Sequence, residues 1–143
     1  MSKLEEAILL AAEAHKGQVD KADMPYILHL LRMMAKMRTE PEMMAAVLHD
    51  VVEDTDWTSE QLREKGFPEE VLKAVECLTK RDEEDYMAFV ERAKANRIAR
   101  QVKIADLEDN MDVRRISNFT LRDAERMEKY NKAWQLLTKA EED

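Results

Sequence analysis

The sequence predicts an all-α fold, and three observations support that prediction. Among 143 residues there are only two glycines and three prolines, which leaves little material for the tight turns of a sheet protein. The chain is rich in Ala, Leu, Met, Glu, Lys and Arg, the residues that favour helices. Its apolar side chains also recur at helical spacing between capping signals. At this length we expect a single domain over residues 1–143, which buries roughly two-thirds of the surface of the unfolded chain.

The first two helices are marked by their ends. Ser2 and Glu5 form a capping box for a helix that stops at Gly17, a residue typical of helix C-termini. A polar loop follows. Pro25 then suits the first turn of a second helix, which we expect to reach Met37.

The same signals continue through the middle of the chain. Thr39 and Glu42 form a second capping box, and the helix that they open is expected to continue through residues 46–55. Thr58 and Gln61 form a third capping box a few residues later. These two boxes predict a long helix followed by a short one.

Four more helical segments are predicted in the second half of the chain. Helical spacing indicates a helix over residues 68–80, a further segment that begins at Asp82, and a long helix over residues 97–113. Thr120 is the expected N-cap of the final helix. The last residues, 141–143, are expected to fray.

The net negative charge of the chain limits the classes of partner that it can bind. The formal net charge is −8 at pH 7. Duplex nucleic acid and anionic membranes both require a basic surface, so we expect neither as a partner. A small phosphorylated ligand is compatible with an acidic protein, because a few local Lys or Arg side chains suffice to bind it.

We expect a cytoplasmic location. The one cysteine, Cys77, cannot form an internal disulfide, and its apolar neighbours at helical spacing indicate a core thiol. The apolar run over residues 7–12 is too short to cross a bilayer. Lys3, Glu5 and Glu6 are unlike the start of a signal peptide.

The candidate chemistry is concentrated in residues 46–55. At helical spacing His49 lies one turn from Glu53, and Asp50 lies one turn from Asp54. Carboxylates crowded among apolar neighbours repel one another and are costly to bury unless a cation or a proton neutralises them. A divalent metal would resolve that conflict. The alternative is a solvated acidic helix end with His49 as a core residue.

Two other predicted helices offer matching side chains. His29 stands in a mostly apolar helix, where taken alone it fits a core histidine. Asp106 lies one turn before Asn110 on the long helix, and a buried Asp again needs a cation or hydrogen-bond donors. Together with His49 and Asp50 these residues would form a mixed nitrogen and oxygen site with open positions. Such a site suits Mn, Fe, Zn or Mg.

His15 and the methionines each allow two interpretations. His15, at the end of the first helix, either meets the negative end of the helix dipole or hydrogen-bonds to a metal ligand. Five of the ten methionines cluster at residues 33–34, 37 and 43–44. Gap-filling in a helical core explains them, and a Met-rich surface for a partner helix is the alternative.

Five motifs in this order resemble the HD superfamily of metal-dependent phosphohydrolases, and more narrowly the hydrolase domain of RelA/SpoT enzymes. The motifs are AHKGQ at 14–18, PYILH at 25–29, LHDVVEDT at 48–55, LTK at 78–80 and VKIADLEDN at 102–110. The similarity is close to the small stand-alone members and covers about residues 5–113. It implies a compact helical HD-domain bundle, and we expect no synthetase domain, because little of the length remains for one.

The resemblance implies roles for individual residues. It implies a Mn²⁺ site with four ligands, which are His29, His49, Asp50 and Asp106. Glu53 and Asp54 would position and deprotonate the attacking water, and Asn110 would contact the substrate. The family reaction is hydrolytic removal of the 3′-pyrophosphate of guanosine alarmones, and some stand-alone members act on a phosphate of a nicotinamide dinucleotide.

Local cations are needed where an acidic protein binds an anionic substrate, and three lysines lie in or beside the motifs. Lys21 is the expected phosphate contact. Lys103 is expected mainly to organise the carboxylates by pairing with Glu53 or Asp106. Lys80 either contacts substrate or caps a helix C-terminus.

Two positions depart from the family pattern. Asp20 stands where alarmone hydrolases have an arginine that stacks on the guanine base, and an aspartate cannot stack in that way. Leu30 follows His29 where the family has a proline, which should alter the helix locally without removing a ligand. The first departure leaves the base of the substrate open.

We therefore expect a Mn-dependent phosphohydrolase that cleaves a phosphate or pyrophosphate ester of a small nucleotide, with guanosine alarmones as one substrate class. One rival is an HD-type nucleotidase without preference for a 3′-pyrophosphate. The other is a metal- or nucleotide-binding sensor without catalysis. The presence of both Glu53 and Asp54 speaks against the sensor, because metal binding alone requires neither. The oligomeric state is left open.

Overall fold

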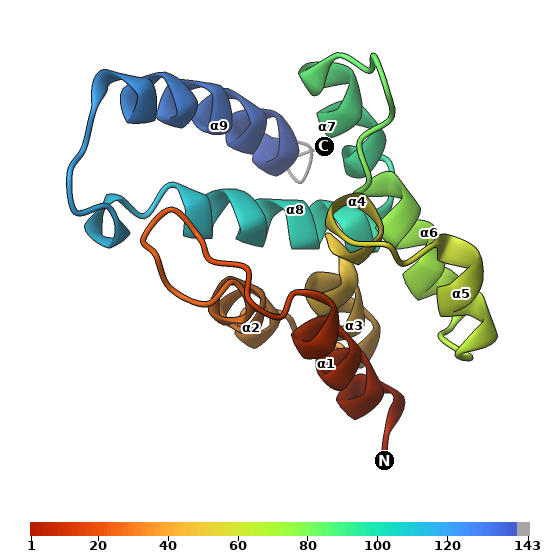
Figure 1. Cartoon of the computed structure of the whole chain (residues 1–143). Helices are drawn as coiled ribbons and strands as arrows, with labels where there is room; N and C mark the ends of the chain where they lie inside the picture. Colours follow the sequence, from red (N-terminus) through yellow and green to blue (C-terminus); the bar gives the residue numbers. More distant parts are fainter. Residues whose placement is uncertain (140–143) are drawn as a thin grey trace.

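The computed structural model describes residues 1–139, and the regular elements in that part of the chain are helices (Figure 1). In chain order they are α1 (Lys3–Ala14), α2 (Ile27–Ala35), α3 (Glu40–Leu48), α4 (Val51–Asp54), α5 (Ser59–Glu64), α6 (Glu69–Cys77), α7 (Tyr86–Lys94), α8 (Arg97–Asn110), the 3₁₀ helix η1 (Val113–Arg115) and α9 (Leu121–Lys139). The all-α prediction is confirmed. The fraying expected for residues 141–143 lies outside the described residues. Within residues 1–139, no helix combines the length and hydropathy needed to cross a membrane.

The helix α8 lies at the centre of the fold. It packs against α2, α3 and α6, and also against α7 and α9 (Figure 1). A large apolar cluster joins α1, α2, α3, α6 and α8. A smaller one, made of Val90, Leu107, Ala133 and Leu137, joins α7, α8 and α9. The two apolar clusters therefore share α8.

All three predicted capping boxes are present. In each box the capping side chain accepts a hydrogen bond from a backbone N–H in the first turn, and the residue there reaches back to the N–H of the cap. The pairs are Ser2 with Glu5, Thr39 with Glu42, and Thr58 with Gln61. Each cap stabilises its helix by about 1 kcal/mol. The sequence therefore located these three helix starts correctly.

The continuous helix predicted through residues 46–55 is wrong. The helix α3 ends at Leu48, and α4 begins at Val51. Between them the ring Nδ1 of His49 donates a hydrogen bond to the Ala46 carbonyl at 2.8 Å. In an uninterrupted helix that carbonyl accepts the backbone N–H of residue 50. The side chain competes for this acceptor, and Asp50 takes φ −103° and ψ 0° instead of continuing α3.

Other helix ends differ from expectation by a few residues. Pro25 pairs with Val19 in an isolated β-bridge, so α2 begins after the proline rather than at it. The helix α6 ends earlier than predicted, and Val113 belongs to η1 rather than to α8. Thr120 precedes α9 as expected, but its hydroxyl donates to the Asp123 carboxylate at 3.0 Å.

The clustered methionines belong to the core. Met33, Met37 and Met44 are buried, and Met34 and Met43 are partly buried against the same apolar cluster. Gap-filling is confirmed as their role, because side chains that line the core do not form an open groove for a partner helix.

Candidate metal centre and active site

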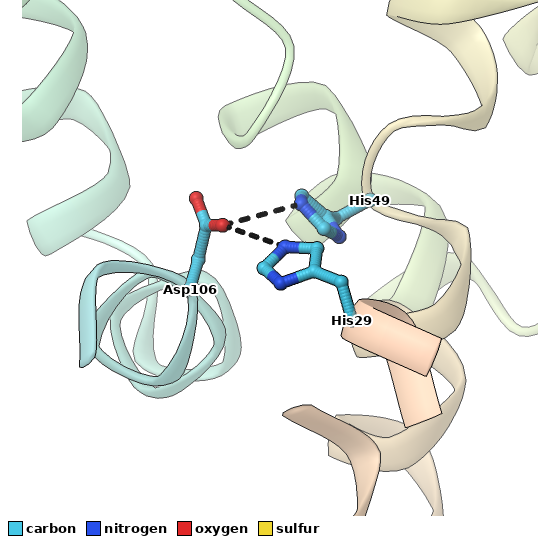
Figure 2. A group of neighbouring side chains, drawn as sticks. All are labelled: His29, His49 and Asp106. Atoms are coloured by element: carbon cyan, nitrogen blue, oxygen red, sulfur yellow. Dashed lines mark hydrogen bonds and ion pairs between the residues drawn. The ribbon is translucent and has the colours of Figure 1, made fainter. Parts of the chain in front are cut away.

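Three helices bring together the side chains expected to bind metal (Figure 2). His29 projects from α2, His49 is the C-cap residue of α3, and Asp106 lies on α8. One ligand atom from each of the three lies within 4.8 Å of the others. Asp106 Oδ1 is 3.0 Å from His29 Nε2 and 4.0 Å from His49 Nε2. The three side chains are only 2%, 3% and 9% exposed, so they form a buried centre and not a surface cluster.

Hydrogen bonds behind the two imidazoles fix which nitrogen faces the centre. The Nδ1 of His49 donates to the Ala46 carbonyl, which leaves Nε2 directed at Asp106. The Nδ1 of His29 is 2.5 Å from Asp109 Oδ2, and its Nε2 likewise faces Asp106. A carboxylate or carbonyl behind a ligating imidazole orients the ring and raises its basicity. Two imidazole nitrogens and one carboxylate oxygen are a donor set that suits a divalent metal.

Asp109 was missed by the sequence analysis. It is buried, accepts from His29, and is itself held by Arg32 Nε at 2.7 Å and Arg115 Nη1 at 3.0 Å. Burial alone would raise the pKa of Asp109, but the bonds from His29 and Arg32 hold that pKa well below its usual range. The signal was available: Asp106 and Asp109 are three residues apart and so share one face of α8.

Asp50 lies beside this cluster of three. Its Oδ2 is 3.0 Å from His49 Nε2 and also accepts a hydrogen bond from the Tyr26 hydroxyl. Its role as a fourth ligand stays a prediction. Tyr26 was part of a quoted motif but had been given no role. His15 packs behind it, with the two ring centroids 5.0 Å apart and His15 Nδ1 2.9 Å from Gln18 Oε1. The structure thus places His15 behind the site, where it supports Tyr26 and through it Asp50.

The charged groups at the centre shift the pKa values of one another. Burial lowers the pKa of His49, but the carboxylates of Asp50 and Asp106 outweigh it and raise that pKa to about 9. Burial raises the pKa of Asp106, yet the Lys103 ammonium and the His29 imidazole hold it well below the ordinary value. The carboxylates therefore stay ionised and need positive charge near them, which either protons or a metal can supply.

Two of the residues named as possible substrate contacts, Lys103 and Asn110, touch Asp106. The Nζ of Lys103 is 3.2 Å from Asp106 Oδ2, one of the two pairings predicted for this lysine. The side-chain amide of Asn110 donates to Asp106 Oδ1 at 3.0 Å. Both groups hold the carboxylate in place. Their contact with substrate stays a prediction.

A cavity of about 340 Å³ opens over the centre between α4, α7, α8 and α9. It is lined by four carboxylates, those of Asp50, Glu53, Asp54 and Asp106, and by three lysines, Lys80, Lys103 and Lys129. Tyr86, Phe89 and Tyr130 provide aromatic walls. The cavity thus joins groups that can accept a proton to groups that can neutralise a phosphate.

Glu53 and Asp54 have different surroundings in this cavity. The backbone N–H of Lys80 donates to Glu53 Oε1 at 2.8 Å, which fixes the direction of that carboxylate. Burial and the neighbouring charges of Asp50 and Glu53 raise the pKa of Asp54 above its ordinary value. A raised pKa suits a carboxylate that takes a proton during the reaction.

A second cavity, of about 330 Å³, adjoins the first and shares Tyr26 and Asn110 with it. Lys21 lines this second cavity, as expected for a loop lysine that contacts substrate, and Arg126 of α9 lines it as well. Arg126 and Lys129 were missed, because nothing in the spacing of α9 indicates that it lies over the site. The contribution of α9 could be recognised only in three dimensions.

Asp20 is fully engaged in the second cavity. Its Oδ1 accepts the backbone N–H groups of Ala22 and Met24, and its Oδ2 is 2.5 Å from Arg115 Nη2. The aspartate therefore closes its own loop and ties that loop to η1. Asp20, which cannot stack on a base, therefore stabilises the loop and its contact with η1.

Comparison with known proteins establishes the family. The model of the HD domain matches residues 7–114. This chain belongs to the HD-domain family. A solved structure of a metazoan ortholog of SpoT that hydrolyses ppGpp is similar over 96% of this chain and 85% of that chain, with a TM-score of 0.78 and 27% sequence identity. The predicted HD-domain bundle and the resemblance to RelA/SpoT hydrolase domains are confirmed.

Curated relatives show the same relationship. The chain is 32% identical to guanosine-3′,5′-bis(diphosphate) 3′-pyrophosphohydrolase MESH1 of Drosophila melanogaster over an alignment that covers 90% of this chain and 79% of that protein. It is 38% identical over 86 residues to the bifunctional (p)ppGpp synthase/hydrolase SpoT of Escherichia coli K12, covering 57% of this chain and 12% of SpoT. The chain spans about an eighth of the length of the first bacterial relatives that it matches, at 11% to 13%.

We predict that His49→Ala abolishes metal binding at this centre. Protein purified without chelator should contain about one divalent metal per chain, and the variant none, because one of three closely placed donors is removed. Asp109→Asn should instead weaken affinity by about 10- to 100-fold through the orientation of His29. Glu108→Gln, at the exposed neighbour of Asp109, is the control and should bind like the wild type. Elemental analysis measures all three, and normal metal content in His49→Ala would contradict the site.

We also predict that metal binding releases a proton. Because the pKa of His49 is raised to about 9 without metal, its ring is protonated at neutral pH and must lose that proton to bind a cation. Apparent affinity should therefore weaken by about tenfold for each pH unit below this pKa. Calorimetry in buffers of different ionisation enthalpy measures the protons released. Binding with no proton release near pH 7 would contradict this protonation state.

Proposed function

We propose that this protein is a Mn²⁺-dependent phosphohydrolase that removes a phosphate or pyrophosphate group from a small nucleotide. One observation carries the proposal: besides the ligand candidates Asp50 and Asp106, the cavity at the metal centre is lined by two further carboxylates, those of Glu53 and Asp54. Metal binding alone does not require that pair, whereas hydrolysis requires a proton acceptor beside the metal. The names of MESH1 and SpoT support the substrate class, because both relatives act on guanosine tetraphosphate-type nucleotides.

The side chains of the site have three separate proposed roles: metal binding, proton acceptance and orientation of water. His29, His49 and Asp106, with Asp50 as the proposed fourth ligand, would hold a divalent metal, which would polarise a phosphoryl oxygen and lower the pKa of water. Asp54, with its raised pKa, is the proton acceptor. Glu53 is fixed by the Lys80 backbone and orients the water for attack.

Three cations from the loop and from α9 form the proposed phosphate-binding end. Burial and the nearby charges of Arg126 and Lys129 lower the pKa of Lys21, while Asp123 opposes this effect. Like charges that converge in this way repel one another, and a bound anion relieves the repulsion. Since Lys21 and Arg126 line one cavity and Lys129 the other, a substrate with phosphates at two positions can contact both.

The environment of Asp20 favours a second candidate, an HD-type nucleotidase without preference for guanine. Asp20 cannot stack on a base, and it holds Arg115 against η1. Arg115 is also bound to Asp109, so this guanidinium is committed to two carboxylates. Turnover of a panel of phosphorylated nucleotides, with and without Mn²⁺, separates the two candidates. Preference for a guanosine 3′-pyrophosphate supports the first, similar rates for different bases support the second, and no turnover contradicts both.

The cellular setting completes the proposal. We infer a cytoplasmic location and no duplex nucleic acid as partner, on the grounds of the lone Cys77 and the net charge of −8.

We predict that Asp54→Asn lowers kcat by on the order of 10²–10⁴, because the proton acceptor is deleted while volume is kept. Glu53→Gln should lower kcat as well, since the neutral amide orients water less well. Metal content should stay near that of the wild type in both variants. Steady-state kinetics beside elemental analysis provide the measurement. If both variants keep full turnover, the acidic pair is scaffold and the enzyme proposal loses its main support.

We predict that Lys21→Ala and Lys129→Ala each raise KM by about 10-fold, because each removes one charge-assisted contact to phosphate. Lys132→Ala is the matched control: it lies on the same helix as Lys129, but its Nζ pairs with Glu128 at 3.4 Å on the exposed surface. Its KM should equal that of the wild type. Equal KM values in all three variants would show that the phosphate end lies elsewhere.

A further inference from the structure

The Tyr86 hydroxyl is an unexplained polar group at the candidate active site. Within residues 1–139 it is one of two buried side-chain atoms that lack a hydrogen-bond partner, the other being His15 Nε2. Tyr86 begins α7 and lines the cavity over the metal centre. A buried hydroxyl without a partner is unfavourable, and native proteins rarely keep one without a function. The hydroxyl therefore has hydrogen-bonding capacity that the protein itself does not use.

The ring of Tyr86 is held in place by its neighbours. Phe89 packs against it edge to face, with the ring centroids 6.4 Å apart at 71°. The Nζ of Lys129 lies 4.0 Å from the centroid of the Tyr86 ring, and that of Lys103 lies 5.8 Å away. The phenol thus has a fixed direction, and two ammonium groups lie close to it.

The chemistry of this wall suits an acceptor-only anion. Burial raises the pKa of Tyr86, with Lys103 opposing and Asp106 assisting, so the phenol keeps its proton at neutral pH and can donate. Lys103 and Lys129 can donate but cannot accept. A phosphoryl group offers several acceptor oxygens and no donor, which matches this set.

We propose that the Tyr86 hydroxyl donates a hydrogen bond to a non-bridging oxygen of the substrate phosphoryl group. This inference rests on the proposed hydrolase function and adds a substrate contact to it. The hydroxyl is shielded from water, and Lys129, exposed on α9, lies over the ring. Movement of this long side chain toward the incoming phosphate uncovers the hydroxyl. Tyr86 and Lys129 then bind the same anion from α7 and α9.

The variant Tyr86→Phe tests the contact. It keeps the ring and removes a hydroxyl that has no partner in the protein, so thermal stability and metal content should not fall. We expect kcat/KM to fall by about 10- to 100-fold, as for loss of one hydrogen bond to a charged group. Tyr26→Phe is the matched comparison: it deletes a hydroxyl that donates to Asp50, so it should lower the melting temperature.

Binding of inorganic pyrophosphate to the Mn²⁺-loaded protein, measured by calorimetry, separates this inference from the proposed function. Weaker binding to Tyr86→Phe, by about 10-fold, supports the contact even if the wild type hydrolyses no nucleotide on the panel. Unchanged turnover and unchanged pyrophosphate affinity in the variant overturn the contact and leave the hydrolase proposal standing. A destabilised variant that loses activity only in proportion to its folded fraction also overturns it. A wild type that neither binds pyrophosphate nor hydrolyses a nucleotide overturns both.

Discussion

The buried carboxylate of Asp106 is the charge on which the rest of the site depends. It lies on the central helix that the two apolar clusters share, where an uncompensated carboxylate would strongly destabilise the fold. Compensation comes from His29, His49, Lys103 and Asn110, which reach it from α2, α3 and α8. These contacts tie three helices to one point. The arrangement that stabilises the buried charge also aims two imidazole nitrogens at a common centre.

A chain of ionic contacts extends from this centre to the loop that borders the second cavity. His29 is 2.5 Å from Asp109, Asp109 is 3.0 Å from Arg115, and Arg115 is 2.5 Å from Asp20. Each link joins a different part of the chain: α2, α8, η1 and the loop before α2. The orientation of a metal ligand is therefore physically connected to the shape of the loop that carries Lys21. Asp20 stabilises this connection because it can accept both from Arg115 and from its own loop backbone.

Local signals in the sequence predicted the helices and the ligand candidates, but not how distant segments meet. Capping boxes such as Thr39 with Glu42 depend on residues three apart, so the sequence contains everything that forms them. The break between His49 and Asp50 depends on a side chain that competes for a backbone carbonyl, which propensity does not reveal. Asp109 shares a face with Asp106 and could have been recognised. Arg126 and Lys129 could not, since only the return of α9 across α8 brings them to the cavities.

Cationic side chains line the cavities of a protein whose overall charge is negative, and this arrangement favours a small ligand. The protein carries a net charge of −8, yet Lys21, Lys103, Arg126 and Lys129 line the two cavities. At physiological ionic strength a surface charge is screened within about 8 Å, so a phosphate inside a cavity interacts mainly with the nearest lysines and arginines. A long polyanion extends beyond the cavities and meets the acidic surface, which repels it. A small phosphorylated ligand gains the local attraction and avoids most of that repulsion. The same balance supports the proposed nucleotide substrate and the expectation that duplex nucleic acid is not a partner.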